Sequence, residues 1–157
     1  MKTADADILI IPGLGHSGPG HWQHRCLERE IMMATRPVVL VGHSLGVQTI
    51  VAASQTQADT KVKGAFLVAP PDVDEHPDVP EATSPFRGLS SDPLRFPSML
   101  VASSNDPYCS VERAAEFAAR WGSDFHVAGD VGHINIESGH GPWPEGLLMF
   151  TRLMSRI

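Results

Sequence analysis

The chain has 157 residues, of which 42% are hydrophobic and 19% are charged, and its formal net charge is −6 at pH 7. This length and composition predict one soluble globular domain rather than a disordered chain. The negative charge, with no cluster of lysine and arginine, excludes the electrostatic footprint of a nucleic-acid-binding protein and disfavours binding to anionic membranes.

The amino-terminal segment has Asp5 and Asp7 where a signal peptide would need its apolar region. No later apolar run is long enough to span a bilayer, so we expect a cytoplasmic protein. The two cysteines, Cys26 and Cys109, are too few for a disulfide framework and match no zinc-binding spacing. Both are expected to be free thiols.

An apolar run over residues 8–11 predicts a buried strand that ends at Pro12 and Gly13. The glycine-rich stretch 13–20 follows and leads into a helix predicted from about His21 to Glu30. Its glycine spacing matches neither of the two phosphate-binding patterns. The stretch fits instead an oxyanion loop, in which backbone N–H groups must come close to a substrate oxygen.

Residues 38–46, VVLVGHSLG, combine a buried strand with the motif G-x-S-x-G around Ser44. This combination is typical of a nucleophile elbow, a tight turn that strains the serine backbone and pushes its hydroxyl clear of the sheet. Glycines are needed at positions 42 and 46 because side chains there would collide with the neighbouring strand and helix. An amphipathic pattern then predicts a helix from Ser44 to about Ala58.

Residues 62–68 form the next apolar run and predict a third strand. The following segment, 69–97, holds seven of the thirteen prolines and lacks regular periodicity. It is expected to be an irregular loop over the ends of the strands. Two interpretations remain open for this loop: a minimal lid over an active site, or a surface excursion.

Residues 98–103 and 124–128 predict the fourth and fifth strands, separated by a helix that Ser110 can cap and Gly122 can end. An apolar stripe from Trp143 to Met154 predicts a terminal helix. Strands that alternate with helices predict an α/β fold, a three-layer α/β/α sandwich with a mostly parallel sheet of about five strands.

Three candidate catalytic residues follow predicted strands, where the carboxyl ends of a parallel sheet bring loops together. They occur in the order Ser44, Asp106 and His133, which is the order of α/β hydrolases. A serine hydroxyl is a poor nucleophile at neutral pH, so His133 would accept its proton and Asp106 would orient the imidazole. The backbone N–H groups of Leu14 and Leu45 are the predicted oxyanion hole.

Each of these residues also has a structural interpretation. Ser44 would then be a helix N-cap, Asp106 an ordinary turn aspartate before a proline, and His133 a loop cap. Asp130 is the rival carboxylate, although it lies in the same loop as His133. His43 is expected to be a packing or hydrogen-bonding neighbour of the elbow rather than a base.

A histidine group on and before the first predicted helix raises the alternative of a metal site, formed by His16, His21 and His24. No carboxylate or cysteine completes the set, so no metal or cofactor is expected. Trp22 and Trp143 would line an acyl pocket or, more commonly for aromatic residues on helices, belong to the core.

Five motifs span nearly the whole chain: PGLGHSGPGHWQ (12–23), VVLVGHSLG (38–46), LVAPPDV (67–73), SSNDPYCS (103–110) and GHINIESGHGPWPEG (132–146). In these motifs the sequence resembles the small serine hydrolases of the YdeN and retinoblastoma-binding serine hydrolase group. The resemblance implies a compact α/β-hydrolase fold with a minimal cap, a triad matching Ser44, Asp106 and His133, and esterase- or amidase-like activity.

The chain departs from that group between Glu30 and Ile31. Members of the group carry a further strand and helix there, about thirty residues by comparison with a βαβ unit. Either the natural protein has a segment here that this sequence omits, or the segment is truly deleted. A true deletion would leave the first strand at a sheet edge, open to homodimer pairing, and a right-handed connection would require the first helix to change faces.

Two functions therefore stay open. The first is a serine hydrolase that cleaves a small-molecule carboxylic ester or amide through an acyl-Ser44 intermediate, without a cofactor. The alternative is a protein-interaction module that keeps the hydrolase scaffold with little or no turnover.

Overall fold

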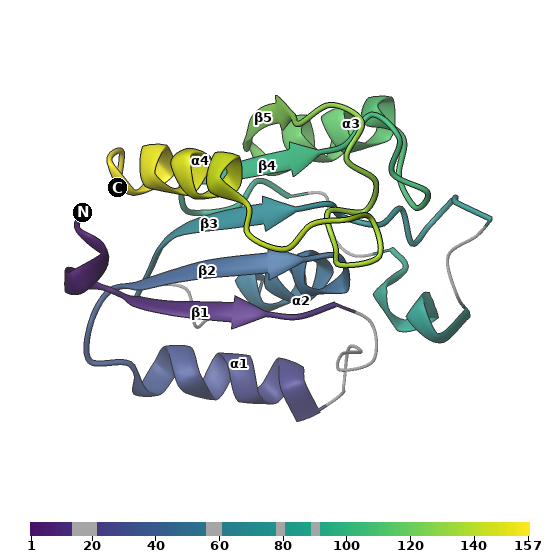
Figure 1. Cartoon of the computed structure of the whole chain (residues 1–157). Coiled ribbons are helices and arrows are strands. Elements are labelled where there is room, and N and C mark those ends of the chain that lie inside the picture. Colours follow the sequence, from purple (N-terminus) through teal and green to yellow (C-terminus); the bar gives the residue numbers. More distant parts are fainter. Residues whose placement is uncertain (14–21, 56–60, 78–80, 89–91) are drawn as a thin grey trace.

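The computed structural model of the protein describes residues 1–13, 22–55, 61–77, 81–88 and 92–157. The strands in these ranges form one sheet of five, parallel throughout, in the order β1-β2-β3-β4-β5 (Figure 1). Their bounds are β1 (Asp7–Ile11), β2 (Val38–His43), β3 (Val62–Val68), β4 (Ser98–Ala102) and β5 (Asp124–Val127). The predicted α/β/α sandwich with a parallel sheet of about five strands is confirmed.

Helices cover the two faces of the sheet unequally (Figure 1). Their bounds are α1 (Trp22–Met33), α2 (Leu45–Ser54), α3 (Val111–Trp121) and α4 (Pro144–Met154), with short 3-10 helices η1 (Thr3–Asp5) and η3 (Glu81–Phe86). The first three α-helices pack on one face and α4 packs on the other. Strands that follow one another in one direction put the helices of right-handed connections on a single face.

The core follows the alternation of side chains along the strands. On β2, Val38 and Leu40 pack toward α1, α2 and α3, whereas Val39 and Val41 pack toward α4. The central strands are buried on both faces, which explains why their sequences read as continuous apolar runs.

Strand β1 lies at one end of the sheet and pairs with β2 from Asp7 to Ile11. Helix α1 runs unbroken through Glu30 and Ile31 and packs on the same face as α2, the face that a direct right-handed connection requires. The other face of β1 has little cover, because Ile8 is 37% and Ile10 76% exposed. Whether a segment is missing at this junction stays a prediction.

Most element boundaries differ little from the predictions. The largest difference is at α2, which is predicted to reach Ala58 and ends at Ser54; residues 56–60 lie outside the described ranges. The proline-rich segment 69–97 is largely irregular, but it contains η3. Within the described residues, no helix is long and apolar enough to cross a membrane. The cytoplasmic location stays a prediction.

Candidate active site

Ser44 occupies the sharp turn between β2 and α2. Its φ of 55° and ψ of −128° put a non-glycine residue in the strained left-handed half of the backbone map. A Cβ at position 46 would lie 2.1 Å from the carbonyl oxygen of Ile11, and a Cβ at Gly42 would lie 2.7 Å from Cδ1 of Ile50. Glycine is therefore required at position 46 by the backbone of β1, and at position 42 a side chain would crowd Ile50 of α2 and the backbone of Gly46, which lies 3.0 Å away.

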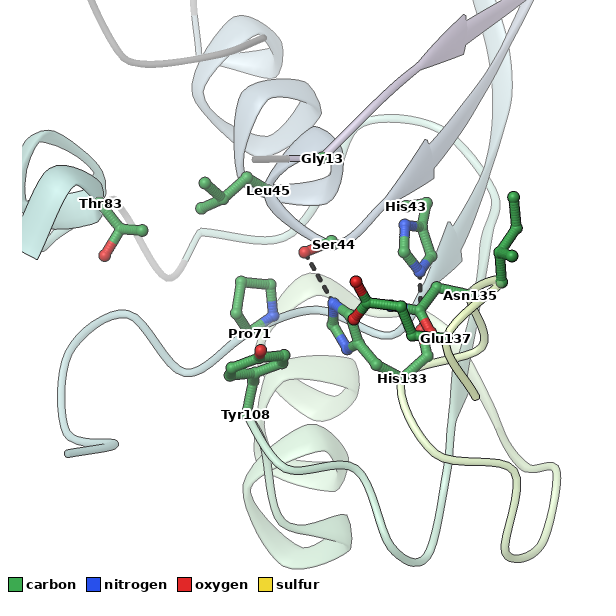
Figure 2. A pocket seen from close by; sticks show the side chains of 11 residues that line it. Gly13, His43, Ser44, Leu45, Pro71, Thr83, Tyr108, His133, Asn135 and Glu137 are labelled. Atoms are coloured by element: carbon green, nitrogen blue, oxygen red, sulfur yellow. Dashed lines mark hydrogen bonds between the residues drawn. The ribbon is translucent and has the colours of Figure 1, made fainter. Parts of the chain in front are cut away.

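The three predicted catalytic side chains come together beyond the carboxyl ends of the strands. Figure 2 shows two of them, Ser44 and His133, joined by a hydrogen bond. The Oγ of Ser44 lies 2.9 Å from Nε2 of His133, and Nδ1 of His133 lies 3.0 Å from both carboxylate oxygens of Asp106. The Asp106 side chain is 2% exposed and that of His133 is 9% exposed. The hydroxyl, imidazole and carboxylate thus form one continuous, water-shielded chain of hydrogen bonds.

The competing structural interpretations fit this geometry poorly. The hydroxyl of Ser44 makes no capping hydrogen bond to α2, so it is directed at His133 instead. The carboxylate that meets His133 is Asp106, whereas Asp130 is exposed. The predicted capping role of Ser110 is found, because its Oγ accepts a hydrogen bond from the N–H of Arg113 at the start of α3.

The loop that carries His133 is held by the loop that carries Asp106. The N–H of Val131 donates to Oγ of Ser103 at 3.1 Å, and the N–H of Gly132 donates to Oδ1 of Asn105 at 2.6 Å. The carboxylate of Asp106 also accepts a hydrogen bond of 2.9 Å from the N–H of Tyr108. The main chain before His133 is therefore tied to the side chains of Ser103 and Asn105, and these bonds hold His133 beside Asp106.

His43, the residue before Ser44, contacts His133 directly. Its Nε2 lies 2.8 Å from the main-chain oxygen of His133, and the two ring centroids are 5.0 Å apart. A carbonyl oxygen only accepts hydrogen bonds, so this nitrogen carries a proton. Burial lowers the pKa of His43 below its ordinary value and favours the neutral ring. The expected role of a hydrogen-bonding neighbour is thus found.

A pocket of about 480 Å³ opens over these groups. It is lined by Gly13, His43, Ser44, Leu45, Pro71, Thr83, Tyr108, His133, Asn135, Ile136 and Glu137. Figure 2 shows Ser44 and His133 at its centre, with Tyr108 and Pro71 on one side and His43 on another. Such a volume suits a small-molecule substrate.

The structure describes one of the two residues predicted to form the oxyanion hole. Leu45 begins α2 directly after Ser44, so its N–H is one of the unpaired donors at a helix N-terminus. Leu14 lies outside the described residues. Its neighbour Gly13 lies against Ser44, because a Cβ there would be 2.8 Å from the Cβ of Ser44. The first residue of the glycine-rich stretch therefore lies against Ser44.

The proline-rich segment forms one wall of the pocket. Pro71 and Thr83 line it, and the main-chain oxygen of Pro71 accepts a hydrogen bond of 3.0 Å from Nε2 of Gln48 on α2. The adjacent Asp72 is anchored to α3 by an ion pair of 3.2 Å with Arg113. This part of the segment is a fixed wall of the site rather than a surface excursion.

Sequence reasoning missed several pocket residues. The ring of Tyr108 packs edge-on against His133, with centroids 4.7 Å apart, and Asn135 and Glu137 line the pocket just after His133. Their only signal is their distance of two to four residues from Asp106 and His133. Among the proposed metal ligands, His16 and His21 lie outside the described residues. The described side chains contain no group of three that could hold a metal ion.

Comparison with known proteins gives one family and a set of similar folds. A family model described as serine hydrolase matches residues 25–152. A YdeN-like hydrolase from Pectobacterium atrosepticum is 29% identical, with 96% of this chain and 91% of that chain covered and a TM-score of 0.77. The ydeN gene product of B. subtilis is 14% identical, with 96% and 99% covered and a TM-score of 0.75.

A carboxylesterase from Bacillus cereus is also similar in structure. It is 15% identical, with 99% of this chain and 91% of that chain covered and a TM-score of 0.57. The carboxylesterase and the B. subtilis protein are both too distant in sequence to indicate a shared activity. Their similarity to this chain shows the fold alone. No functionally curated protein matches the chain.

Proposed function

The chain belongs to the serine hydrolase family, and from this membership we propose that it cleaves a carboxylic ester or amide through an acyl-Ser44 intermediate. In this proposal Ser44 is the nucleophile, His133 the general base and acid, and Asp106 the residue that orients the imidazole. The observation that carries it is the pair of contacts made by His133, at 2.9 Å to the Ser44 hydroxyl and 3.0 Å to the Asp106 carboxylate.

Acylation would begin as the Ser44 oxygen attacks the carbonyl carbon and passes its proton to Nε2 of His133. The tetrahedral intermediate then collapses, and the leaving alcohol or amine takes that proton from His133. The carboxylate of Asp106 accepts the hydrogen bond of the Nδ1 proton, which fixes the tautomer that leaves Nε2 free to act as a base.

Deacylation would repeat these steps with water as the nucleophile. Water gives one proton to His133 as its oxygen attacks the acyl carbon, and the Ser44 oxygen recovers that proton when the carboxylic acid leaves. Negative charge on the carbonyl oxygen in both steps would be stabilised by the N–H groups of Leu45 and Leu14. Loss of one such donor costs roughly 3 kcal/mol in comparable sites.

A fluorophosphonate probe tests the proposal, because it reacts with an activated serine and not with an ordinary hydroxyl. We expect the probe to label the folded wild-type protein stoichiometrically. The Ser44→Ala variant should not be labelled. Ser104→Ala is the matched control, since Ser104 is exposed in the loop before Asp106 and should label normally. A folded wild-type protein without label would overturn the proposal and favour the protein-interaction alternative.

A further inference from the structure

An apolar groove lies on the face of the sheet that α4 covers. Its volume is about 400 Å³, and β1, β2, β3 and α4 supply most of its lining. The lining residues are Ile8, Ile10, Val41, Gly42, His43, Phe66, Val68, Ile134, Trp143, Gly146, Leu147 and Phe150. The groove exists because α4 covers the middle of the sheet and leaves the β1 side open (Figure 1).

The groove begins at the catalytic residues. Gly42 and His43 directly precede Ser44 in the chain, and Ile134 directly follows His133. His43 lines both the groove and the catalytic pocket, so the two hollows are neighbours on either side of this residue. A chain attached to a carbonyl group at Ser44 therefore has an apolar surface within one residue of the reacting atoms.

The lining selects for hydrocarbon. Among the described residues that form it, none carries a charge at neutral pH, since the one ionisable group is the ring of His43. The nitrogen Nε2 of that ring is already bonded to the main-chain oxygen of His133. At the rim of the groove, Ile10 is 76% exposed and Leu147 is 65% exposed. These large apolar side chains are therefore in contact with solvent, and no described residue covers them.

We propose that this groove binds the linear hydrocarbon chain of an ester substrate whose carbonyl carbon lies at Ser44. The inference rests on the proposed function and names its substrate class, an ester with a medium-length or long apolar chain. The position of the groove beside the catalytic pocket, with His43 in the lining of both, favours this occupant over a second copy of the chain. A copy seated on the open β1 side would instead bury Ile10 and Leu147 in a dimer interface.

Two ester series test the groove. In p-nitrophenyl esters the acyl chain grows from acetate to decanoate, and in alkyl acetates the alcohol chain grows from ethyl to decyl. Burial of one methylene group is worth about 0.8 kcal/mol, or about fourfold in kcat/KM. Because the groove is open on one side, we expect about a two- to fourfold rise for each added methylene in one of the two series.

Helix α4 offers a matched pair of variants. Leu147 lines the groove, whereas Leu148 is the next residue, is 71% exposed and does not line it. Leu147→Asp should lose at least tenfold in kcat/KM on the decanoate or decyl substrate of the responsive series and stay within twofold on the short acetates. Leu148→Asp should behave as the wild type on both.

The proposal falls if neither series depends on chain length, or if the two variants respond alike. It also falls if sedimentation velocity shows a wild-type dimer that Leu147→Asp dissociates, because the groove would then be an interface between copies. The proposed function is tested apart from this by hydrolysis of the acetate ester. If the acetate ester is cleaved but chain length has no effect, the proposed hydrocarbon site is rejected and the proposed hydrolase function is retained.

Should the acetate ester not be cleaved, decanoate binding to the folded protein still tests the groove by calorimetry. Heat of binding that Leu147→Asp removes and Leu148→Asp retains would support the hydrocarbon site by itself. Absence of any binding would reject it.

Discussion

The Nε2 nitrogen of His43 lies 2.8 Å from the main-chain oxygen of His133 and donates its proton to it. This bond joins the nucleophile elbow to the loop that carries the proposed base. Ser44 is the residue after His43. The same contact therefore fixes the position of the Ser44 hydroxyl relative to the His133 imidazole. We infer that His43 is a positioning residue that acts through His133 and not a base.

Removal of this donor should lower turnover on a short acetate ester. His43→Leu is expected to reduce kcat by about ten- to a hundredfold with little change in KM, because displacement of a catalytic group by about 1 Å has costs of this order. His43→Gln keeps an N–H donor near the position of Nε2 and should stay within about threefold of the wild type. Equal losses in both variants would refute the positioning role.

His43 should also make stability depend on pH. Burial lowers its pKa in the folded state, while the unfolded chain keeps a value near 6.5. As pH falls through 6.5, the unfolded state binds a proton at His43 before the folded state does. The free energy of unfolding therefore decreases as the pH is lowered, and this group contributes at most about 1.4 kcal/mol per pH unit to the decrease.

Urea denaturation at pH 5, 6 and 7 measures this dependence. The wild type should lose more of its free energy of unfolding between pH 7 and pH 5 than His43→Gln, which has no group to titrate. The comparison cancels the contributions of the other histidines. Parallel curves for the two proteins would show that His43 is not held neutral by the fold.

Asp106 and Asp130 give a direct test of the carboxylate assignment. Asp106→Asn replaces an acceptor at Nδ1 of His133 by an amide that favours the wrong tautomer, so kcat should fall by about 10⁴-fold with the fold intact. Asp130→Asn alters an exposed side chain and should stay within twofold. Ester hydrolysis checks both, and a larger loss in Asp130→Asn would reverse the assignment.

Much of this site could be predicted from local sequence because its parts obey local rules. A buried run followed by glycines at positions 42 and 46 specifies the elbow, since a Cβ at either position would come within 3.0 Å of backbone atoms of the turn or of β1. Asp106 and His133 could be found because parallel strands bring their carboxyl ends to one edge. The glycine requirement depends only on the turn and its immediate neighbours, and the position of the strand ends depends only on the sheet being parallel.

Contacts between loops could not be predicted in the same way. The bond from His43 to the His133 main chain joins segments 90 residues apart, and the wall built by Pro71 depends on a hydrogen bond from Gln48. Neither has a periodic pattern, and proline-rich loops give no spacing to count. The open side of β1 likewise follows from which face α1 packs on, a property of the topology.

The contact between Gly46 and β1 should make this glycine irreplaceable. A Cβ there would lie 2.1 Å from the carbonyl oxygen and 2.8 Å from the carbonyl carbon of Ile11, and backbone atoms cannot rotate away. Gly46→Ala is expected to cost at least about 1–3 kcal/mol of the free energy of unfolding, the usual range for overpacking.

Gly141→Ala is the control for that substitution. A Cβ at Gly141 would have nothing within 4 Å, and the residue is not among the glycines with positive φ. Its free energy of unfolding should stay within about 0.5 kcal/mol of the wild type. Thermal or urea unfolding that ranks the two variants equally would contradict the close packing of α2 on β1.

Cys109 should be chemically inert in the folded protein. It is 4% exposed, and burial, followed by the nearby charges of Asp72 and Asp106, raises its pKa from 9.0 to about 12. The thiolate is the reactive form, so its fraction at pH 8 should be about a thousandfold lower than that of an ordinary thiol. In a Cys26→Ser background, iodoacetamide at pH 8 should modify Cys109 completely in urea and negligibly without it. Rapid modification of the native protein would place the thiol in contact with solvent, and the packing of Cys109 beside α3 and the Asp106 loop would then be wrong.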